Sequence, residues 1–149
     1  MISRRYGAAG IVLAKSFVIF GGKDGSGEFS STEIITEEGQ VSPGPEMPTA
    51  IYQHAIAGVN ATTSILTGGS IGIGQSAKPY SPLTWYFNHV SQEFQPGPSL
   101  ITGRRHHASG TIQDQDTKKD IVAVVGGKRE GIALDSTEFL INGEWTPGK

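Results

Sequence analysis

The feature that most constrains this chain is a pair of adjacent glycines that closes a short apolar run in three places. The runs are FVIFGG at residues 17–22, SILTGG at residues 64–69 and VAVVGG at residues 122–127. Recurrence of one pattern at intervals of about 50 residues indicates a repeat architecture, in which each copy is one supersecondary unit. A glycine pair at a strand end indicates positive backbone φ angles or a close approach of neighbouring backbone.

Three further elements accompany each glycine pair in the same order. RRYGAAG, IYQHAIAG and GRRHHASG precede the pairs, and STEII, LTWYF and STEFL follow them. The last element reads GQVSPGP, QEFQPGP and GEWTPG, with an apolar residue two places before the first proline: Val41, Phe94 and Trp145. We expect these three side chains to be buried between adjacent sheets. Aligning Gly7, His54 and His107 keeps the spacing, apart from the polar insert QDQDTKKD in the third copy.

Composition agrees with a chain of short strands and many turns. The 149 residues include 21 glycines and 8 prolines, and only 17% are charged. Runs of β-branched, aromatic and small apolar residues between Gly, Pro, Asn and Asp are typical of strands. The sequence therefore predicts an all-β protein, one region over residues 1–149. It contains three four-stranded antiparallel units at about residues 4–48, 49–101 and 102–149.

In this order the elements resemble the kelch motif: a first strand opened by arginine or histidine, an apolar strand closed by Gly-Gly, and a spaced aromatic pair. The third copy matches best, with Gly126, Gly127, Phe139 and Trp145. The resemblance implies a kelch-type β-propeller in which each copy is one blade. Three blades do not make the usual ring. We expect first a fragment of a longer propeller, next a half of a six-bladed ring closed by a homodimer, and last an open arc.

Charge and cysteine content limit the function classes. A formal net charge of -2 and a pI near 6.1 give no electrostatic reason to expect nucleic acid or an anionic membrane as partner. No apolar run reaches the roughly 20 residues that cross a bilayer, and the start of the chain does not follow a signal peptide pattern. The compartment stays open, with a slight preference for the cytoplasm. Zero cysteine excludes disulfides and thiolate chemistry.

The kelch resemblance implies a partner-binding face at the loops that enter the first strands. By motif position Arg5 and Arg105 match, and Tyr52 takes this place in the second copy. Because guanidinium groups bind carboxylates bidentately, we expect a protein or acidic peptide as partner. The predicted ligand-binding residues are Arg4, Arg5, Tyr52, Tyr80, Arg104 and Arg105. The competing interpretation is a set of solvated loop arginines.

Enzymatic activity is the less favoured reading. His54, His106, His107, Glu33, Glu138 and Tyr80 are the residues that chemistry would need. Glu33 and Glu138 recur at matching places, so we expect scaffold positions and not a general acid and base. The two adjacent histidines lack a carboxylate or a third histidine at fixed spacing. We therefore expect no catalytic residue, metal ligand or cofactor, and keep a carbohydrate-binding or carbohydrate-modifying propeller as the alternative.

Overall fold

The computed structural model describes residues 1–72 and 79–148, and it confirms an all-β protein. The strands are β1 (Ala9–Leu13), β2 (Ser16–Phe20), β3 (Thr32–Thr36), β4 (Val41–Pro43), β5 (Ala55–Asn60), β6 (Thr63–Thr67), β7 (Thr84–Asn88), β8 (Phe94–Pro96), β9 (Ala108–Gln113), β10 (Asp120–Val125), β11 (Lys128–Arg129), β12 (Ile132–Ala133), β13 (Thr137–Ile141) and β14 (Glu144–Pro147). These residues contain no helix that is long and apolar enough to cross a membrane.

Twelve of the strands form three four-stranded antiparallel sheets, and every ladder stays inside one copy of the sequence repeat. We call them the first unit (β1 to β4), the second unit (β5 to β8) and the third unit (β9, β10, β13 and β14). Strands β11 and β12 form a separate hairpin between β10 and β13, which the sequence pattern did not predict.

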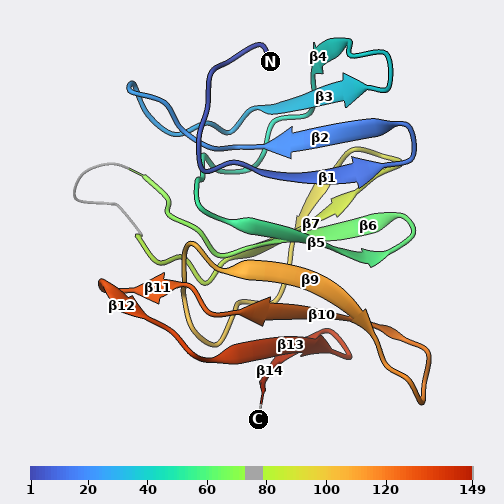
Figure 1. Ribbon diagram of the computed structural model, residues 1–149, viewed down its shortest axis with the longest axis vertical. Coiled ribbons are helices and arrows are strands. Elements are labelled where there is room, and N and C mark those ends of the chain that lie inside the picture. The colour runs from blue at the N-terminus through green and yellow to red at the C-terminus, as the bar shows by residue number, and fades with distance from the viewer. Residues whose placement is uncertain (73–78, 149) are drawn as a thin grey trace.

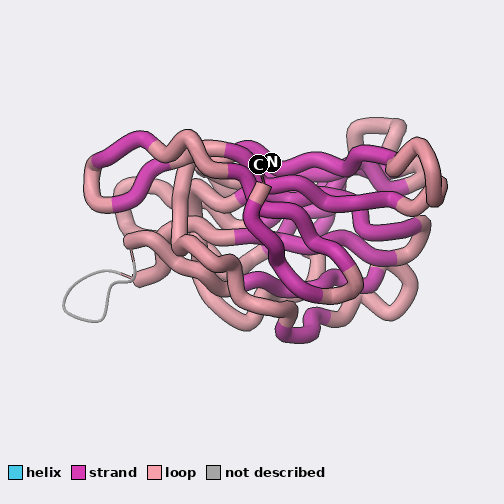
Figure 2. The backbone as a smooth tube through the Cα atoms, turned by 90° about the horizontal axis from the view of Figure 1, so that it is seen from below, coloured by secondary structure: helices cyan, strands magenta, loops and turns pink. Residues whose placement is uncertain are grey.

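The three units lie side by side in chain order, as Figure 1 shows from top to bottom. Their first strands are neighbours, since β5 contacts both β1 and β9. Apart from the β11–β12 hairpin, the strands occupy one half of the molecule, and the longer connections occupy the other half (Figure 2). We call that second half the loop face. It carries the turns that enter β1, β5 and β9 and the described residues of the loops that follow the glycine pairs. The opposite half carries the tight hairpins and is called the hairpin end.

Two apolar clusters fill the junctions between units. The first junction holds Val18, Phe20, Met47, Ile51, Leu66 and Phe87, with Trp85 and Phe94 packed against them. The second junction holds Ala57, Ile65, Leu100, Val122, Val124, Leu140 and Trp145. Strands β5, β6 and β7 of the second unit contribute alternate residues to both clusters, because neighbouring side chains on a strand point to opposite faces. Burial of a sheet on both faces explains why the second strands read as nearly continuous apolar runs.

The glycine pairs have the backbone conformation that the sequence indicated. Both glycines of every pair have positive φ, from 57° at Gly21 to 95° at Gly127. A side chain at Gly69 would also collide with His54 and Ile51 of the entering segment. The fold therefore requires glycine at these positions because of the positive φ angles, and at Gly69 also because there is no space for a side chain.

The turns before the first strands correct our alignment of the three copies. Positive φ occurs at Gly7, Gln53 and His106, so these three residues are equivalent, and not Gly7, His54 and His107. In the second copy the error arises from a β-bulge between Gly58 and Asn60, which adds one residue to β5. The bulge moved the spacing of the second copy by one position, and the sequence pattern could not reveal it.

The fourth strands agree in part with the burial expected of them. Trp145 is buried in the second junction, where its indole N–H donates to the Pro98 carbonyl at 2.9 Å, and Phe94 packs in the first junction. Val41 is only half-buried, and it pairs with Ile35 on a face of the first unit that no other unit covers. Leu140 pairs with Trp145, and Phe139 pairs with Thr146.

Candidate functional site

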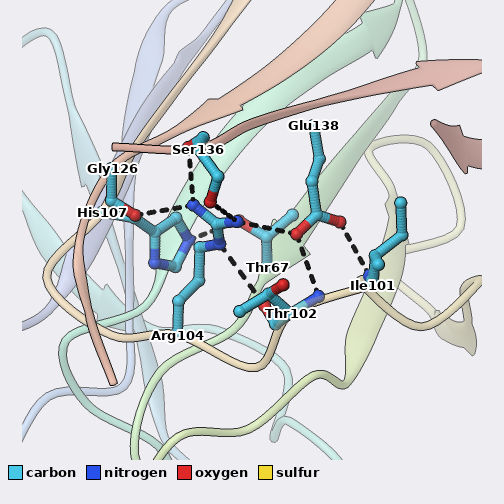
Figure 3. Close-up of polar contacts among 8 residues, drawn as sticks. All are labelled: Thr67, Ile101, Thr102, Arg104, His107, Gly126, Ser136 and Glu138. Carbon is cyan, nitrogen blue, oxygen red and sulfur yellow. Dashed lines mark hydrogen bonds and ion pairs between the residues drawn. The ribbon is translucent and has the colours of Figure 1, made fainter. Parts of the chain in front are cut away.

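The most elaborate polar cluster surrounds Arg104 at the entrance to the third unit (Figure 3). Its guanidinium donates to the Gly126 and Ser136 carbonyls at 2.7 and 3.0 Å and to the Ser136 hydroxyl at 3.0 Å. It also forms an ion pair with Glu138 at 2.8 Å, and its side chain has no exposed surface. The other Glu138 contacts are the backbone N–H groups of Ile101 and Thr102. This cluster ties the incoming segment to the second and third strands of its own sheet.

Arg5 repeats this arrangement in the first unit. It donates to the Gly21 and Ser31 carbonyls and to the Ser31 hydroxyl, and it pairs with Glu33 at 2.7 Å. Burial alone would raise the pKa of Glu33. The N–H groups of Ser3 and Ile2 and the Arg5 guanidinium outweigh that effect, and they hold its pKa below the usual value. Arg5 is therefore the structural equivalent of Arg104, whereas motif position had matched it with Arg105.

These contacts change the role of two predicted binding residues. Arg5 and Arg104 direct their donors inward, and their side chains are 1% and 0% exposed. A partner on the surface cannot reach them without breaking a buried ion pair, so we withdraw both from the predicted ligand-binding set. Glu33 and Glu138 are the scaffold positions that the repeat suggested.

The second unit has no ion pair at this place. Alignment by strand register puts Ile51 where Arg5 and Arg104 stand, and Trp85 where Glu33 and Glu138 stand. Both belong to the apolar cluster of the first junction. One site in the fold therefore accepts either a charged or an apolar pair.

His54 and His107 occupy equivalent places behind the entering segments. Desolvation lowers the pKa of His54 to about 3, and it lowers the pKa of His107 to about 4. Both rings are thus neutral at pH 7. His107 bonds to the Thr67 hydroxyl at 2.8 Å, whereas both ring nitrogens of His54 are buried without a hydrogen-bond partner in the described protein. Within residues 1–72 and 79–148, no three His, Asp or Glu side chains gather as a metal site.

A row of aromatic and cationic residues runs across the loop face. Tyr6, Tyr52 and Arg105 are equivalent, since each forms an isolated bridge with the residue after a glycine pair: Lys23, Ser70 and Lys128. The Lys23 ammonium lies 4.3 Å from the Tyr52 ring centroid and 5.6 Å from that of Tyr6. The Arg105 guanidinium lies 5.3 Å above the ring of Tyr80. We call Tyr6, Lys23, Tyr52, Tyr80, Arg105 and Lys128 the loop-face row.

The row unites three of the six predicted binding residues. Tyr52 is largely buried beneath Lys23, while Tyr80 and Arg105 are half-buried. Arg4 is exposed and next to Arg5, but no contact joins its side chain to the row. Sequence reasoning missed Tyr6, Lys23 and Lys128. Correct alignment of Arg5 with Arg104 would have found Tyr6, because it then falls on Tyr52 and Arg105.

His106 stands beside this row and is exposed. Desolvation, followed by the nearby charges of Arg105 and Lys128, lowers the pKa of its imidazole. The end of the row in the third unit is therefore an electropositive environment, in which an added cation is disfavoured and an anion is favoured.

A cavity of 490 Å³ lies at the hairpin end between the first and second units. Ser64 and His89 line it, and the serine hydroxyl lies 2.8 Å from the His89 Nε2. The pair has the reach of a nucleophile and base, yet Ser64 has no exposed surface in β6. This burial makes the contact a structural hydrogen bond that satisfies a polar group inside the sheet.

Comparison with known proteins gives no relative to guide the assignment. No family model matches the chain, and a search of curated proteins finds no match. The candidate site therefore depends on its own geometry.

Proposed function

We propose that the chain is a non-enzymatic interaction module with kelch-type propeller blades, which binds an acidic segment of a protein partner through the loop-face row. The three four-stranded units, with their first strands adjacent, support the propeller arrangement. Binding surfaces in repeat folds commonly lie on loops held by a rigid scaffold.

The observation that carries this proposal is the contrast between two adjacent arginines. Arg104 is fully buried and saturated with internal contacts. Arg105 is half-buried on the loop face, and within the described residues its side chain donates no hydrogen bond, while its Nε has no partner. Its guanidinium is held over Tyr80 and keeps its donors for a ligand. Arginine in such a position suits planar recognition of a carboxylate.

The remainder of the row favours an acidic peptide over a neutral one. Lys23 and Lys128 occupy the same bridge position in the first and third units and add positive charge at both ends. Tyr6, which is exposed, offers an aromatic surface beside Lys23. A segment with two or three carboxylates spaced by apolar residues would match this alternation.

The test uses fluorescence anisotropy with labelled peptides of matched length, one rich in Glu and Asp and one with Gln and Asn in their place. We expect binding of the acidic peptide, weakened by added salt. Arg105→Ala should raise its Kd about tenfold, which corresponds to about 1.4 kcal/mol for a charge-assisted contact. Arg105→Lys should restore little, because a lysine ammonium has no planar fork.

Lys15→Ala provides the matched control. Lys15 is a cation of the hairpin end, 82% exposed and paired with Glu37, and it lies outside the loop-face row. Its removal should leave the Kd unchanged. Equal binding of the acidic and amide peptides, or equal loss in Lys15→Ala and Arg105→Ala, would show that the row is not the binding site.

A further inference from the structure

Equivalent backbone hydrogen bonds join neighbouring units at both junctions. Gly22 N–H donates to the Ile51 carbonyl, and Gly69 N–H donates to the Arg104 carbonyl, both at 2.8 Å. In the return direction, Gln53 N–H donates to the Gly7 carbonyl at 2.6 Å, and His106 N–H donates to the Gln53 carbonyl at 2.9 Å. At both junctions, therefore, the preceding unit binds the following unit through an equivalent backbone N–H donor and an equivalent backbone carbonyl acceptor.

A third bond repeats in the same way. Ile51 N–H donates to the Phe29 carbonyl at 3.2 Å, and Arg104 N–H donates to the Ser81 carbonyl at 3.4 Å. The structure thus defines a general rule for joining units. A segment of seven residues before each first strand attaches to the loop that follows the preceding glycine pair.

The third unit presents this receiving surface without an occupant in the described chain. By register, its equivalent groups are the Gly127 N–H and the carbonyls of His106 and Leu134. A side chain built on Gly21 or Gly68 would collide with the carbonyl of Ile51 or Arg104. At Gly126 the space that those carbonyls fill is open.

The first unit presents the complementary surface. Residues 1–7 are equivalent to 47–53 and 100–106, which are the segments that attach to a preceding unit. Glu33 holds the backbone of Ile2 and Ser3 in place, as Glu138 holds Ile101 and Thr102. The donating segment is therefore already folded in the shape that the junction requires.

Burial marks both surfaces as uncovered. Phe20 and Thr67 are buried at the junctions, whereas the equivalent Val125 is 49% exposed. Met47 and Leu100 are buried likewise, whereas the equivalent Met1 is 61% exposed. Positions that are buried in every internal copy and carry an exposed apolar side chain in the terminal ones indicate an interface of the same kind.

We propose that a second copy of this chain occupies both surfaces, head to tail. Residues 1–7 of each copy attach to the loop after Gly126 and Gly127 of the other. Gly127 N–H donates to the Arg5 carbonyl of the second copy, and its Gly7 N–H donates to the His106 carbonyl. Two such contacts close a dimer and leave neither surface open, as a heterologous interface does when its rotation closes. This inference is independent of the proposed peptide binding.

A second copy is the occupant because the chain itself carries both halves of the contact. The donor segment, the receiving loop and the apolar residues beside them follow the geometry of two junctions that already exist in the molecule. The groups at the two surfaces match another unit of the same type, and a second copy of this chain supplies such a unit. The new interface is thus continuous with an established one.

Light scattering after size exclusion tests the proposal on the 149-residue chain. We expect a single species at twice 15.8 kDa. A monomer at tens of micromolar, or a polydisperse series of larger species, would overturn it. In the monomer case the surfaces would be covered by something other than this chain.

Two variants test the interface, and each places a charge in one of the two surfaces. Val125→Glu acts on the third unit, and Phe17→Glu acts on the uncovered face of the first unit, where Phe17 is partly exposed. Either change should convert the dimer to a monomer with unchanged far-ultraviolet circular dichroism. Val90→Glu is the matched control, since Val90 is exposed in the turn between β7 and β8 and lies on neither surface. A dimer that survives both Val125→Glu and Phe17→Glu contradicts the proposal.

Mixing the two variants distinguishes the head-to-tail arrangement from a symmetric contact. A mixed dimer has both glutamates in one interface and none in the other, so that one native interface remains. We expect dimer to reappear on mixing, at weaker affinity than the native chain. If mixing Val125→Glu with Phe17→Glu yields only monomer, although each variant is folded, the head-to-tail arrangement is wrong.

Discussion

The second unit and its two neighbours fill the same site, where the chain enters the sheet, with residues of opposite polarity. Where the chain enters the first and third sheets, Arg5 and Arg104 form buried ion pairs with glutamates of the third strand. Where it enters the second sheet, Ile51 and Trp85 take those places in an apolar cluster. The backbone path is the same in all three, with equivalent hydrogen bonds to the preceding unit wherever there is one.

The difference teaches that the fold requires the site to be filled but does not require charge. The Trp85 indole nitrogen is buried there without a hydrogen-bond partner in the described protein. A buried ion pair gains Coulomb energy and loses hydration, and the two nearly cancel. An apolar pair of similar volume reaches the same end through burial. What the arginine adds is a bond to the carbonyls at the first glycine and at the end of the following loop, such as Gly126 and Ser136.

Removing one partner of the pair should produce the largest effect. Glu138→Ala leaves the Arg104 guanidinium buried without its counter-ion and frees the N–H groups of Ile101 and Thr102. We expect the free energy of unfolding to fall by about 3–5 kcal/mol, measured by urea denaturation. A loss under 1 kcal/mol would mean that water reaches the site.

Replacing both residues of the ion pair by their apolar equivalents tests the same comparison more directly. The double variant Arg104→Ile, Glu138→Trp gives the third unit the residues of the second. We expect it to recover most of the stability that Glu138→Ala loses, since no charge is then left buried. If the double variant is as unstable as Glu138→Ala, the two sites are not interchangeable.

The entering segments also carry His54 and His107. Their titration should make the free energy of unfolding depend on pH, with an effect of intermediate size. The folded pKa values, about 3 and about 4, lie below the 6.5 of an ordinary histidine. The unfolded chain therefore takes up protons first as pH falls, and stability decreases from about pH 6.5 toward the folded pKa. Each histidine contributes about 1.4 kcal/mol per pH unit.

The leucine variants separate the two histidines. His54→Leu and His107→Leu should each flatten the fall of unfolding free energy between pH 6.5 and 4.5, measured by urea denaturation at several pH values. At pH 7.5 only His107→Leu should cost stability, about 1 kcal/mol, because it breaks the bond to Thr67. Unchanged pH slopes in both variants would show that the rings are hydrated.

The smallest effect is expected at the surface. Lys15 and Glu37 also form an ion pair, at 3.2 Å, but the lysine side chain is 82% exposed. Lys15→Ala should change the unfolding free energy by less than about 0.5 kcal/mol, and 1 M salt should abolish even that difference. A loss comparable to that of Glu138→Ala would contradict the view that burial sets the value of these pairs.

The strands were predictable from sequence because local chemistry determines them. Glycine pairs and PGP segments mark the ends of strands, and alternating apolar residues mark their faces. These signals lie within a few residues of each other in the sequence. The inward role of Arg5 and Arg104 was not predictable in the same way. Their glutamate partners come from the third strand, and only the folded sheet brings them within 3 Å.

The exact match between copies also escaped sequence reasoning. The bulge in the second copy and the longer β9–β10 turn in the third copy change the count of residues without changing the pattern of types. Arg5 was therefore matched with Arg105, and Tyr6 was missed. The β11–β12 hairpin was missed because KREGIALD lacks the alternation of a strand pair. Phe139 and Leu140 are adjacent in β13, and the pleat of the strand places their side chains on opposite faces of the sheet. Only Leu140 therefore shares a face with Trp145.

The bulge at Gly58 and Asn60 has one further consequence, for how this repeat tolerates insertions. It sits at the hairpin end, and so does the six-residue turn at residues 114–119, which extends the third copy. Extra residues there leave the backbone bridges of Tyr6, Tyr52 and Arg105 in phase. Protein engineers can therefore lengthen the β9–β10 turn with a tag or epitope while the opposite side of the molecule keeps its geometry.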